Sequence, residues 1–244
     1  MNALDGWTKS SFTHDGVAHD TYRKGTGPGV IVIHEVPGIT PDVAAFADEV
    51  VAQGFTVVMP HLFGTPGAKI GPASMAKAAG QICVSREFLR MAKGTTTPVA
   101  TWLRALAKEL HAELGGPGVG AVGMCFTGGY ALAMLADAPI AAPVLAQPSA
   151  PFAVSPGRSA DLGLSPADLD AVKAKVSAGC EVLGLRYRND LAVGKRFDTL
   201  RRELGDNFIA VEFSGMLHST LTMHRQQLGV DRVLSFFREK LQVQ

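Results

Sequence analysis

The sequence lacks an excess of charge of either sign. Its 244 residues carry 23 lysines and arginines against 22 aspartates and glutamates, and no run of basic residues stands out. A nucleic-acid site needs clustered cations to neutralise phosphates, and an anionic membrane surface attracts the same kind of cluster. The composition therefore predicts a protein that binds neither nucleic acid nor membranes.

Cysteine is scarce, and no secretory signal or membrane span stands out. The three cysteines, Cys83, Cys125 and Cys180, are far apart and form no C-x-x-C pair, so neither a disulfide framework nor a zinc site is indicated. The first ten residues contain no apolar segment, which leads us to expect a cytoplasmic protein with reduced thiols. The least charged stretch, 116–150, is interrupted by glycine and proline, which favours short buried strands over a membrane span.

The chain has instead an alternation of short apolar runs with helical patterns. We expect strands at 30–33, 55–59, 119–122, 140–145, 181–185 and 208–213, with helices between and after them. This alternation predicts one α/β domain over residues 1–244, with a mostly parallel central sheet and helices on both faces. The segments 61–96 and 147–165 show no such pattern and are expected to be long loops. On the helix that begins near residue 98, we expect Arg104 to face the solvent.

A glycine-flanked cysteine follows one of these strands directly. Cys125 lies in the segment Gly-Met-Cys-Phe-Thr-Gly-Gly at 123–129, between a predicted strand and a predicted helix. In α/β-hydrolases the nucleophile occupies such a turn, and the backbone N–H of the next residue, here Phe126, points at the developing oxyanion. The positive end of the helix also favours a thiolate. The alternative is a buried structural cysteine on a glycine-rich turn.

An acid and a histidine follow later strands in the order that this fold requires. Asp190 and His218 each come just after a predicted strand, on the C-terminal side of Cys125. α/β-Hydrolases order their triad as nucleophile, acid and histidine, where the carboxylate orients the imidazole that moves the proton. Asp198 and Asp206 are rival acids, but we expect them within or at the end of the next helix. A solvated loop acid and a loop histidine are the alternative interpretations.

The segment His-Glu-Val-Pro-Gly at 34–38 follows the first central strand. In this fold the corresponding loop supplies a second oxyanion donor, which we expect to be the backbone N–H of Val36. Glu35 is expected to point into the same space as Cys125, where a carboxylate opposes ionisation of the thiol or acts as its base. A solvated loop glutamate is the alternative. No H-E-x-x-H pattern follows, so we expect no metal site.

These segments resemble the dienelactone hydrolases (carboxymethylenebutenolidases) over nearly the whole chain. The residues that carry the resemblance are 34–38, 123–129, Asp190-Leu191-Ala192-Val193 and Gly215-Met216-Leu217-His218. The resemblance implies an α/β-hydrolase fold with Cys125 as the nucleophile and His218 as the base. It also implies that Asp190 orients His218 and that Glu35 partners the resting thiol. The implied reaction is cleavage of a small-molecule ester or lactone through a thioester acyl-enzyme, with no metal or organic cofactor.

Two positions depart from the family's pattern. Thr127 stands where the family usually has glycine, although threonine is small enough to permit the turn. Thr222 stands where dienelactone-specific members have an arginine that grips the substrate carboxylate, and Arg86 is the weak candidate for their other arginine. The sequence therefore predicts the reaction class better than the substrate, with neutral esters favoured over carboxylate-bearing lactones.

Two other functions remain open at this stage. A thiol redox protein would use Cys125 reversibly with Cys83 or Cys180 as its resolving partner, and would form a disulfide under mild oxidation. A non-catalytic binding module on a hydrolase scaffold would bind a ligand without turning it over. The redox alternative does not explain why Asp190 and His218 follow strands in triad order. The oligomeric state is not indicated by any pattern.

Overall fold

A computed structural model describes residues 3–85, 87–88 and 94–242 of the chain. Its sheet has eight strands in the order β1-β2-β4-β3-β5-β6-β7-β8. The strands are β1 (Thr8–His14), β2 (Val17–Lys24), β3 (Gly29–Ile33), β4 (Thr56–Pro60), β5 (Val119–Met124), β6 (Ile140–Ala146), β7 (Val182–Tyr187) and β8 (Phe208–Phe213). β2 pairs antiparallel with β1 and β4, whereas all pairs from β4 to β8 are parallel. The mostly parallel sheet predicted from the sequence is confirmed.

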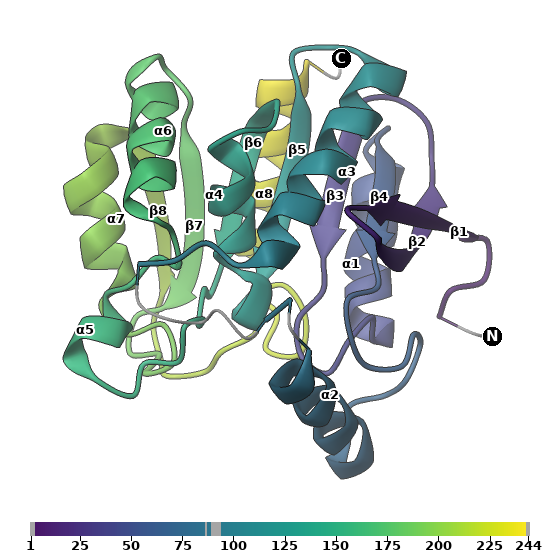
Figure 1. Cartoon of the computed structure of the whole chain (residues 1–244), viewed down its shortest axis with the longest axis horizontal. Coiled ribbons are helices and arrows are strands. Elements are labelled where there is room, and N and C mark those ends of the chain that lie inside the picture. The colour runs from purple at the N-terminus through teal and green to yellow at the C-terminus, as the bar shows by residue number, and fades with distance from the viewer. Residues whose placement is uncertain (1–2, 86, 89–93, 243–244) are drawn as a thin grey trace.

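Helices cover both faces of this sheet (Figure 1). The α-helices of the described residues are α1 (Pro41–Ala52), α2 (Pro72–Val84), α3 (Pro98–Leu114), α4 (Tyr130–Leu135), α5 (Pro156–Ser159), α6 (Pro166–Ser177), α7 (Arg196–Leu204) and α8 (Gln227–Leu241). Of these, α2 and α5 lie beyond the carboxyl ends of the strands rather than over a face. Apolar residues of α3, α4, α6 and α7 pack into one core cluster, and those of α1 and α8 pack into a second. Because the central strands are buried on both faces, they are continuous apolar runs rather than alternating ones.

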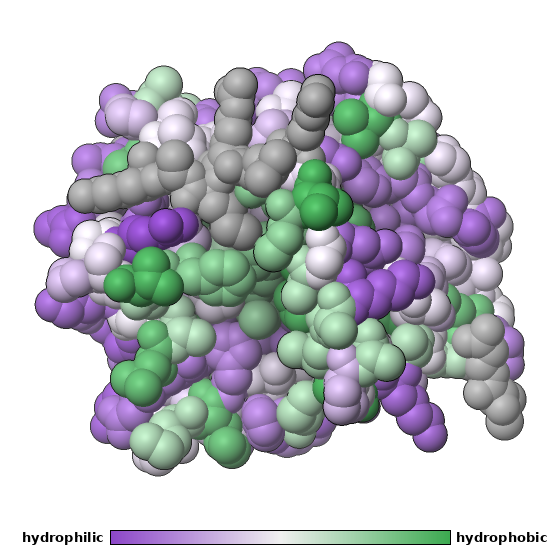
Figure 2. Space-filling view, turned by 60° about the horizontal axis from the view of Figure 1, so that its bottom comes forward, coloured by the Kyte–Doolittle hydropathy of each residue, from purple (hydrophilic) through white to green (hydrophobic). Residues whose placement is uncertain are grey.

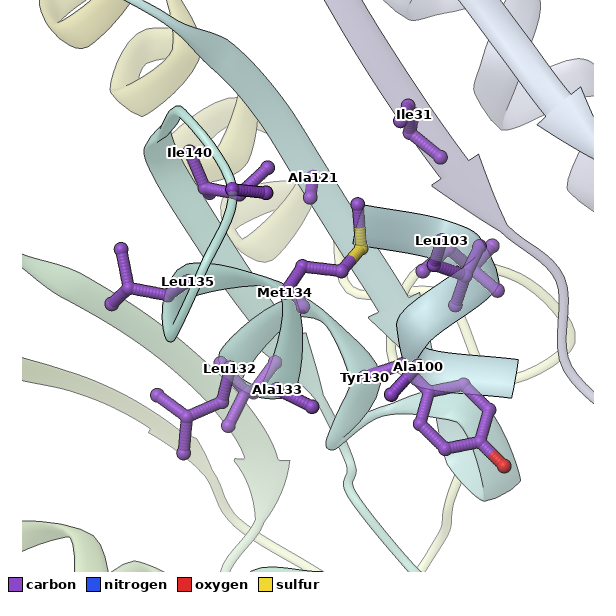
Figure 3. Packing of buried hydrophobic residues seen from close by; sticks show 14 of the residues in the cluster. Ile31, Ala100, Leu103, Ala121, Tyr130, Leu132, Ala133, Met134, Leu135 and Ile140 are labelled. Carbon is purple, nitrogen blue, oxygen red and sulfur yellow. The ribbon is translucent and has the colours of Figure 1, made fainter. Parts of the chain in front are cut away.

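The short helix α4 lies at the centre of the first core cluster. Leu132, Met134 and Leu135 are fully buried there, and Figure 3 shows the side chain of Met134 between Ala121 of β5 and Leu103 of α3. A six-residue helix has little stability of its own, so its position depends on this packing. The packing holds the residues just before α4 at one place on the sheet edge.

Three expectations about local structure were wrong. The strands β1 and β2 were missed because β1 is mostly exposed and neither strand has a continuous apolar run. Both expected loops contain a helix. The segment 61–96 contains α2, whose buried residues are only Ala78 and Ile82, and 147–165 contains the four-residue α5, which buries none, so the apolar pattern of each is faint. Arg104 is buried rather than solvent-facing, because Nε donates to the carbonyl oxygen of Ala133 at 2.8 Å and the guanidinium pairs with Asp168 at 2.9 Å.

The carboxyl ends of the parallel strands meet at one edge of the sheet. Glu35 follows β3, Cys125 follows β5, Asp190 follows β7 and His218 follows β8. In open α/β sheets, ligands bind at this edge because loops from several strands converge there. Among the described residues, no helix is long and apolar enough to cross a membrane.

Candidate active site

Cys125 lies on a strained turn between β5 and α4. Its backbone φ is +55°, a left-handed conformation that costs free energy in residues other than glycine and often marks functional sites. The turn is tight enough to require glycine on both sides. A Cβ at Gly123 would lie 2.2 Å from the carbonyl oxygen of Thr127, and a Cβ at Gly128 would lie 2.5 Å from Cα of Pro148. The turn therefore has the geometry expected for a nucleophile.

Thr127 fixes this turn to the end of β3. The side chain is fully buried, and its hydroxyl group lies within 3.1 Å of the carbonyl oxygen of Ile33 and 3.0 Å of that of His34. The same oxygen accepts a hydrogen bond from the backbone N–H of Met124 at 3.0 Å. Where the family usually has glycine, this chain therefore gains a side chain that ties two loops of the site together.

Asp190 and His218 form a close hydrogen-bonded pair. Nδ1 of His218 lies 2.6 Å from Oδ2 of Asp190, which fits an Nδ1–H that donates to the carboxylate. Oδ1 of Asp190 accepts a hydrogen bond from the backbone N–H of Ala192 at 3.0 Å. Because Asp190 is buried, its carboxylate is held in one orientation. The rival acid Asp198 lies on α7 and pairs with Arg201 instead.

Cys125 also lies close enough to His218 to influence its pKa, which connects all three groups. Burial lowers the pKa of His218, but the interactions with Asp190 and Cys125 outweigh it and raise the pKa to about 10. The imidazolium is therefore the favoured form of His218 at neutral pH. Ser149 is a further neighbour of the thiol, since its Oγ lies 3.5 Å from Sγ of Cys125.

Glu35 is buried in a cradle of uncharged donors. Ser219 donates to Oε2 at 2.8 Å, Thr222 donates to Oε1, and Nε2 of Gln147 lies 3.5 Å from Oε2. Burial raises the pKa of the Glu35 carboxyl group, and these hydrogen bonds only partly oppose the effect. In the described part of the chain, none of its hydrogen bonds reaches Cys125. The pairing of Glu35 with the thiol stays a prediction.

Gln147 links this cradle to the histidine loop and was missed in the sequence analysis. It is fully buried with a φ of +37°, and its Oε1 accepts hydrogen bonds from the backbone N–H and the hydroxyl group of Thr220 at 3.1 and 2.6 Å. Gln147 comes directly after β6. Its position after a parallel strand was the available signal, since the same rule points to Cys125 and Asp190.

Arg196 ties the Asp190 loop to the segment after β6. Its buried guanidinium donates to the carbonyl oxygens of Val193, at 2.9 Å, and of Pro151. Burial lowers the pKa of Arg196 to about 10. Buried carbonyl groups need a hydrogen-bond donor, so moving either loop would leave a carbonyl group without its partner. The two loops therefore hold each other in place.

Two backbone groups remain available for an oxyanion. In the described loops and turns, neither the N–H of Phe126 nor that of Val36 takes part in a backbone hydrogen bond. Arg86, the candidate for binding a substrate carboxylate, lies outside the described residues. Within the described ranges, no group of three or more histidine, cysteine, aspartate or glutamate residues is placed to hold a metal ion.

Comparison with known proteins identifies the family. The model of the dienelactone hydrolase family matches residues 16–160, which include Glu35 and Cys125. The chain belongs to the dienelactone hydrolase family. Membership makes it an ester hydrolase whose substrate is a small molecule. A search of curated proteins finds no match.

Solved structures with the α/β-hydrolase fold of this family are similar over almost the whole chain. A putative dienelactone hydrolase from Klebsiella pneumoniae has 15% identity and a TM-score of 0.63, with 98% of each chain covered. A dienelactone hydrolase-like promiscuous phosphotriesterase from metagenomic libraries has 17% identity and a TM-score of 0.65, covering 96% of this chain and 98% of its own. A cold-adapted esterase from an Arctic intertidal metagenomic library has 16% identity and a TM-score of 0.64, covering 96% and 93%. At such identities the likeness shows the fold alone.

Proposed function

We propose that the protein cleaves carboxylic esters or lactones of small molecules through a triad of Cys125, His218 and Asp190. The observation that carries this proposal is the hydrogen bond between Asp190 and His218, together with the interaction of His218 with Cys125, at the carboxyl edge of the sheet. Each group lies where its chemical role requires it, because the thiol is half-buried on the strained turn and the carboxylate is buried behind the imidazole.

The thiolate of Cys125 attacks the substrate carbonyl carbon, and the oxyanion that forms accepts hydrogen bonds from the N–H groups of Phe126 and Val36. His218 gives its proton to the leaving alcohol, which produces a thioester on Cys125. Acylation removes the thiolate that helps to raise the pKa of His218, so the imidazole can then accept a proton from water. The hydroxide attacks the thioester, and the carboxylic acid leaves as the thiol is restored.

A trapping experiment tests this reaction directly. With p-nitrophenyl acetate as substrate, acid quenching during turnover followed by mass spectrometry of peptides should show an acetyl group on the peptide that contains Cys125. Turnover in which the acetyl group is found on another residue, or on none, would contradict the proposed nucleophile. The measurement reads out the intermediate itself, so it does not depend on a variant that folds.

The placement of Cys180 argues against one of the two resolving partners that the redox alternative would use. That residue lies just before β7, whereas the groups that surround Cys125 lie at the opposite end of the same strand. Six residues of strand span roughly 20 Å, and a disulfide requires Cα atoms within about 7 Å. Cys180 therefore cannot resolve a disulfide with Cys125 in this fold.

The pH dependence of acylation should follow His218. For a simple alkyl ester, kcat/KM should stay level through neutral pH and fall as the pH rises through about 10, because the leaving alkoxide then loses its proton donor. Titration of released acid measures this profile. p-Nitrophenolate leaves without a proton, so the matched p-nitrophenyl ester should show a much weaker fall. Equal falls for both esters would contradict the role of His218 as acid.

The cradle of Glu35 supports a positioning role for this carboxyl group. Two of its hydrogen-bond donors, Ser219 and Thr222, lie one and four residues after His218, and Gln147 holds Thr220 between them. Glu35 thereby anchors the loop that carries the base. The same buried group should also affect stability, since an acid with a raised pKa favours its neutral form in the folded protein.

Replacing Glu35 with glutamine should therefore change how stability depends on pH. The contribution of a carboxyl group with a raised pKa is present below its ordinary pKa and is lost as the pH rises through the folded-state value. From about pH 5 to about pH 8, Tm of the wild type should fall relative to that of Glu35→Gln. Glu109→Gln, at an exposed position on α3, is the control and should show no such trend. Parallel profiles for all three proteins would contradict a buried acid.

The same variant separates the anchoring role from a direct pairing with the thiol. If Glu35 only anchors the histidine loop, the pH dependence of Cys125 alkylation by iodoacetamide should be the same in Glu35→Gln and in the wild type. A faster reaction of the variant at neutral pH would instead show that the carboxylate opposes ionisation of the thiol, as the family resemblance implies.

A further inference from the structure

A cavity whose described lining residues are all uncharged opens beside the nucleophile turn. Its walls include Thr97, Phe126, Tyr130, Ala150, Pro151 and Leu162. They come from segments far apart in the sequence, namely the start of α3, the start of α4 and the segment between β6 and α6. None of the described residues that line the cavity carries a charge.

Two residues that line the cavity are chain neighbours of Cys125 and of Ser149, which contacts the thiol. Phe126 follows Cys125 in the chain, and Ala150 follows Ser149, while Sγ of Cys125 and Oγ of Ser149 are only 3.5 Å apart. Phe126 also contributes the N–H that we assign to the oxyanion hole. A substrate whose carbonyl group lies at Cys125 can therefore extend one of its two arms into this cavity.

The walls of the cavity decide which arm enters. The leaving alcohol must stay beside His218, which protonates it, but no residue of the histidine loop at 214–224 lines the cavity. The cavity therefore receives the acyl group, and the alcohol lies on the side of His218. Leu191 and Leu217, which adjoin Asp190 and His218 in the chain, are exposed. Figure 2 shows apolar side chains gathered across the face at this edge of the sheet.

The chemistry of the walls selects against charge. Phe126 packs edge-on against Phe63, Phe88 and Tyr130, with ring centroids 5.7 to 6.3 Å apart, so the wall is a rigid aromatic surface. A carboxylate buried against such a surface without a partner loses its hydration and gains nothing in return. The polar side chains that line the cavity in the described part of the chain, which include Thr97 and Tyr130, offer hydroxyl groups but no positive charge.

We propose that this cavity is the acyl-group subsite and that the substrates are esters of uncharged, apolar carboxylic acids. The proposal rests on the function proposed above and specifies its substrate class. Each buried methylene group contributes about 0.8 kcal/mol, or roughly a fourfold increase in kcat/KM. For p-nitrophenyl esters, kcat/KM should therefore rise about 15-fold from acetate to butanoate, which is two methylene groups longer. Mono-p-nitrophenyl succinate, which carries a carboxylate at the end of an acyl chain of the same length, should be a poorer substrate than butanoate by about 100-fold or more.

Gly129→Ala is the variant that tests the site of binding. Gly129 lines the cavity with a φ of −79°, and a Cβ there would lie 3.4 Å from the carbonyl oxygen of Leu162, so a methyl group fits and narrows the cavity. The butanoate-to-acetate ratio of kcat/KM should fall about tenfold in this variant. Gly80→Ala is the matched control, because Gly80 lies on the exposed side of α2 with open space around it, and the ratio should not change.

The outcomes separate this proposal from the function on which it rests. Hydrolysis of acetate and butanoate at equal rates, a preference for the succinate ester, or an unchanged ratio in Gly129→Ala would each overturn the acyl subsite while leaving the ester hydrolase intact. Absence of turnover for every ester would overturn both.

Discussion

Cys125→Ala should lower kcat for ester hydrolysis by about 10³-fold or more, the scale of loss seen when a triad nucleophile is removed. Alanine keeps the backbone and the small volume at this turn but cannot form the thioester. The remaining rate would come from water in a site that still binds the substrate and stabilises the oxyanion. The measurement is kcat for p-nitrophenyl acetate, with circular dichroism to show that the variant is folded.

Two other cysteine variants serve as controls. Cys83 is exposed near the end of α2, and Cys180 lies at the opposite end of β7 from the site. Cys83→Ala and Cys180→Ala should therefore retain wild-type kcat. A folded Cys125→Ala protein with unchanged kcat would remove the basis of the mechanism, and a large loss in Cys83→Ala would point to a different thiol.

Asp190→Asn should lower kcat by up to about 10⁴-fold, since replacing the triad acid leaves the imidazole without its carboxylate and in the wrong tautomer. The carboxylate accepts the Nδ1–H of His218 at 2.6 Å and stabilises the imidazolium, whereas an amide does neither reliably. The pKa of His218 should also fall in the variant, because its bond to Asp190 is one of the causes that raise it. The decline of kcat/KM at high pH should then begin at lower pH than in the wild type.

Asp198→Asn and Asp206→Asn distinguish the triad acid from its rivals. Asp198 lies on α7 beside Arg201, and Asp206 lies in the turn that follows α7. Neither is hydrogen-bonded to His218 in the described structure, so both variants should keep kcat near the wild-type value. Loss of activity in either one, with Asp190→Asn active, would show that the acid had been assigned to the wrong residue.

The parts of the fold that could be predicted are those in which burial or helix capping produces a recognisable local sequence pattern. β3 is buried on both faces, so it is a continuous apolar run, and α1 begins where Thr40 caps the backbone N–H of Val43 ahead of a proline. The hairpin of β1 and β2 shows no such pattern. The strands pair with each other at the exposed edge of the sheet, where the solvent-facing side of the hairpin needs no apolar residues.

By itself, the sequence determined the turn at Cys125 and the order of the three triad groups. The glycines around the cysteine are required because other backbone atoms lie too close for a Cβ. Residues just after parallel strands lie at one edge of the sheet whatever their side chains are. Local pattern and strand order were enough to bring Asp190 and His218 to the thiol.

Only the tertiary structure decided what surrounds Glu35 and what forms the acyl cavity. The donors of the Glu35 cradle lie 112 to 187 residues away along the chain, and the walls of the cavity come from three separated segments. No spacing in the sequence identifies a hydroxyl group that will donate to Glu35 or a phenylalanine that will line the cavity. Which of them meet depends on how helices pack across the sheet, and that packing is a property of the whole chain.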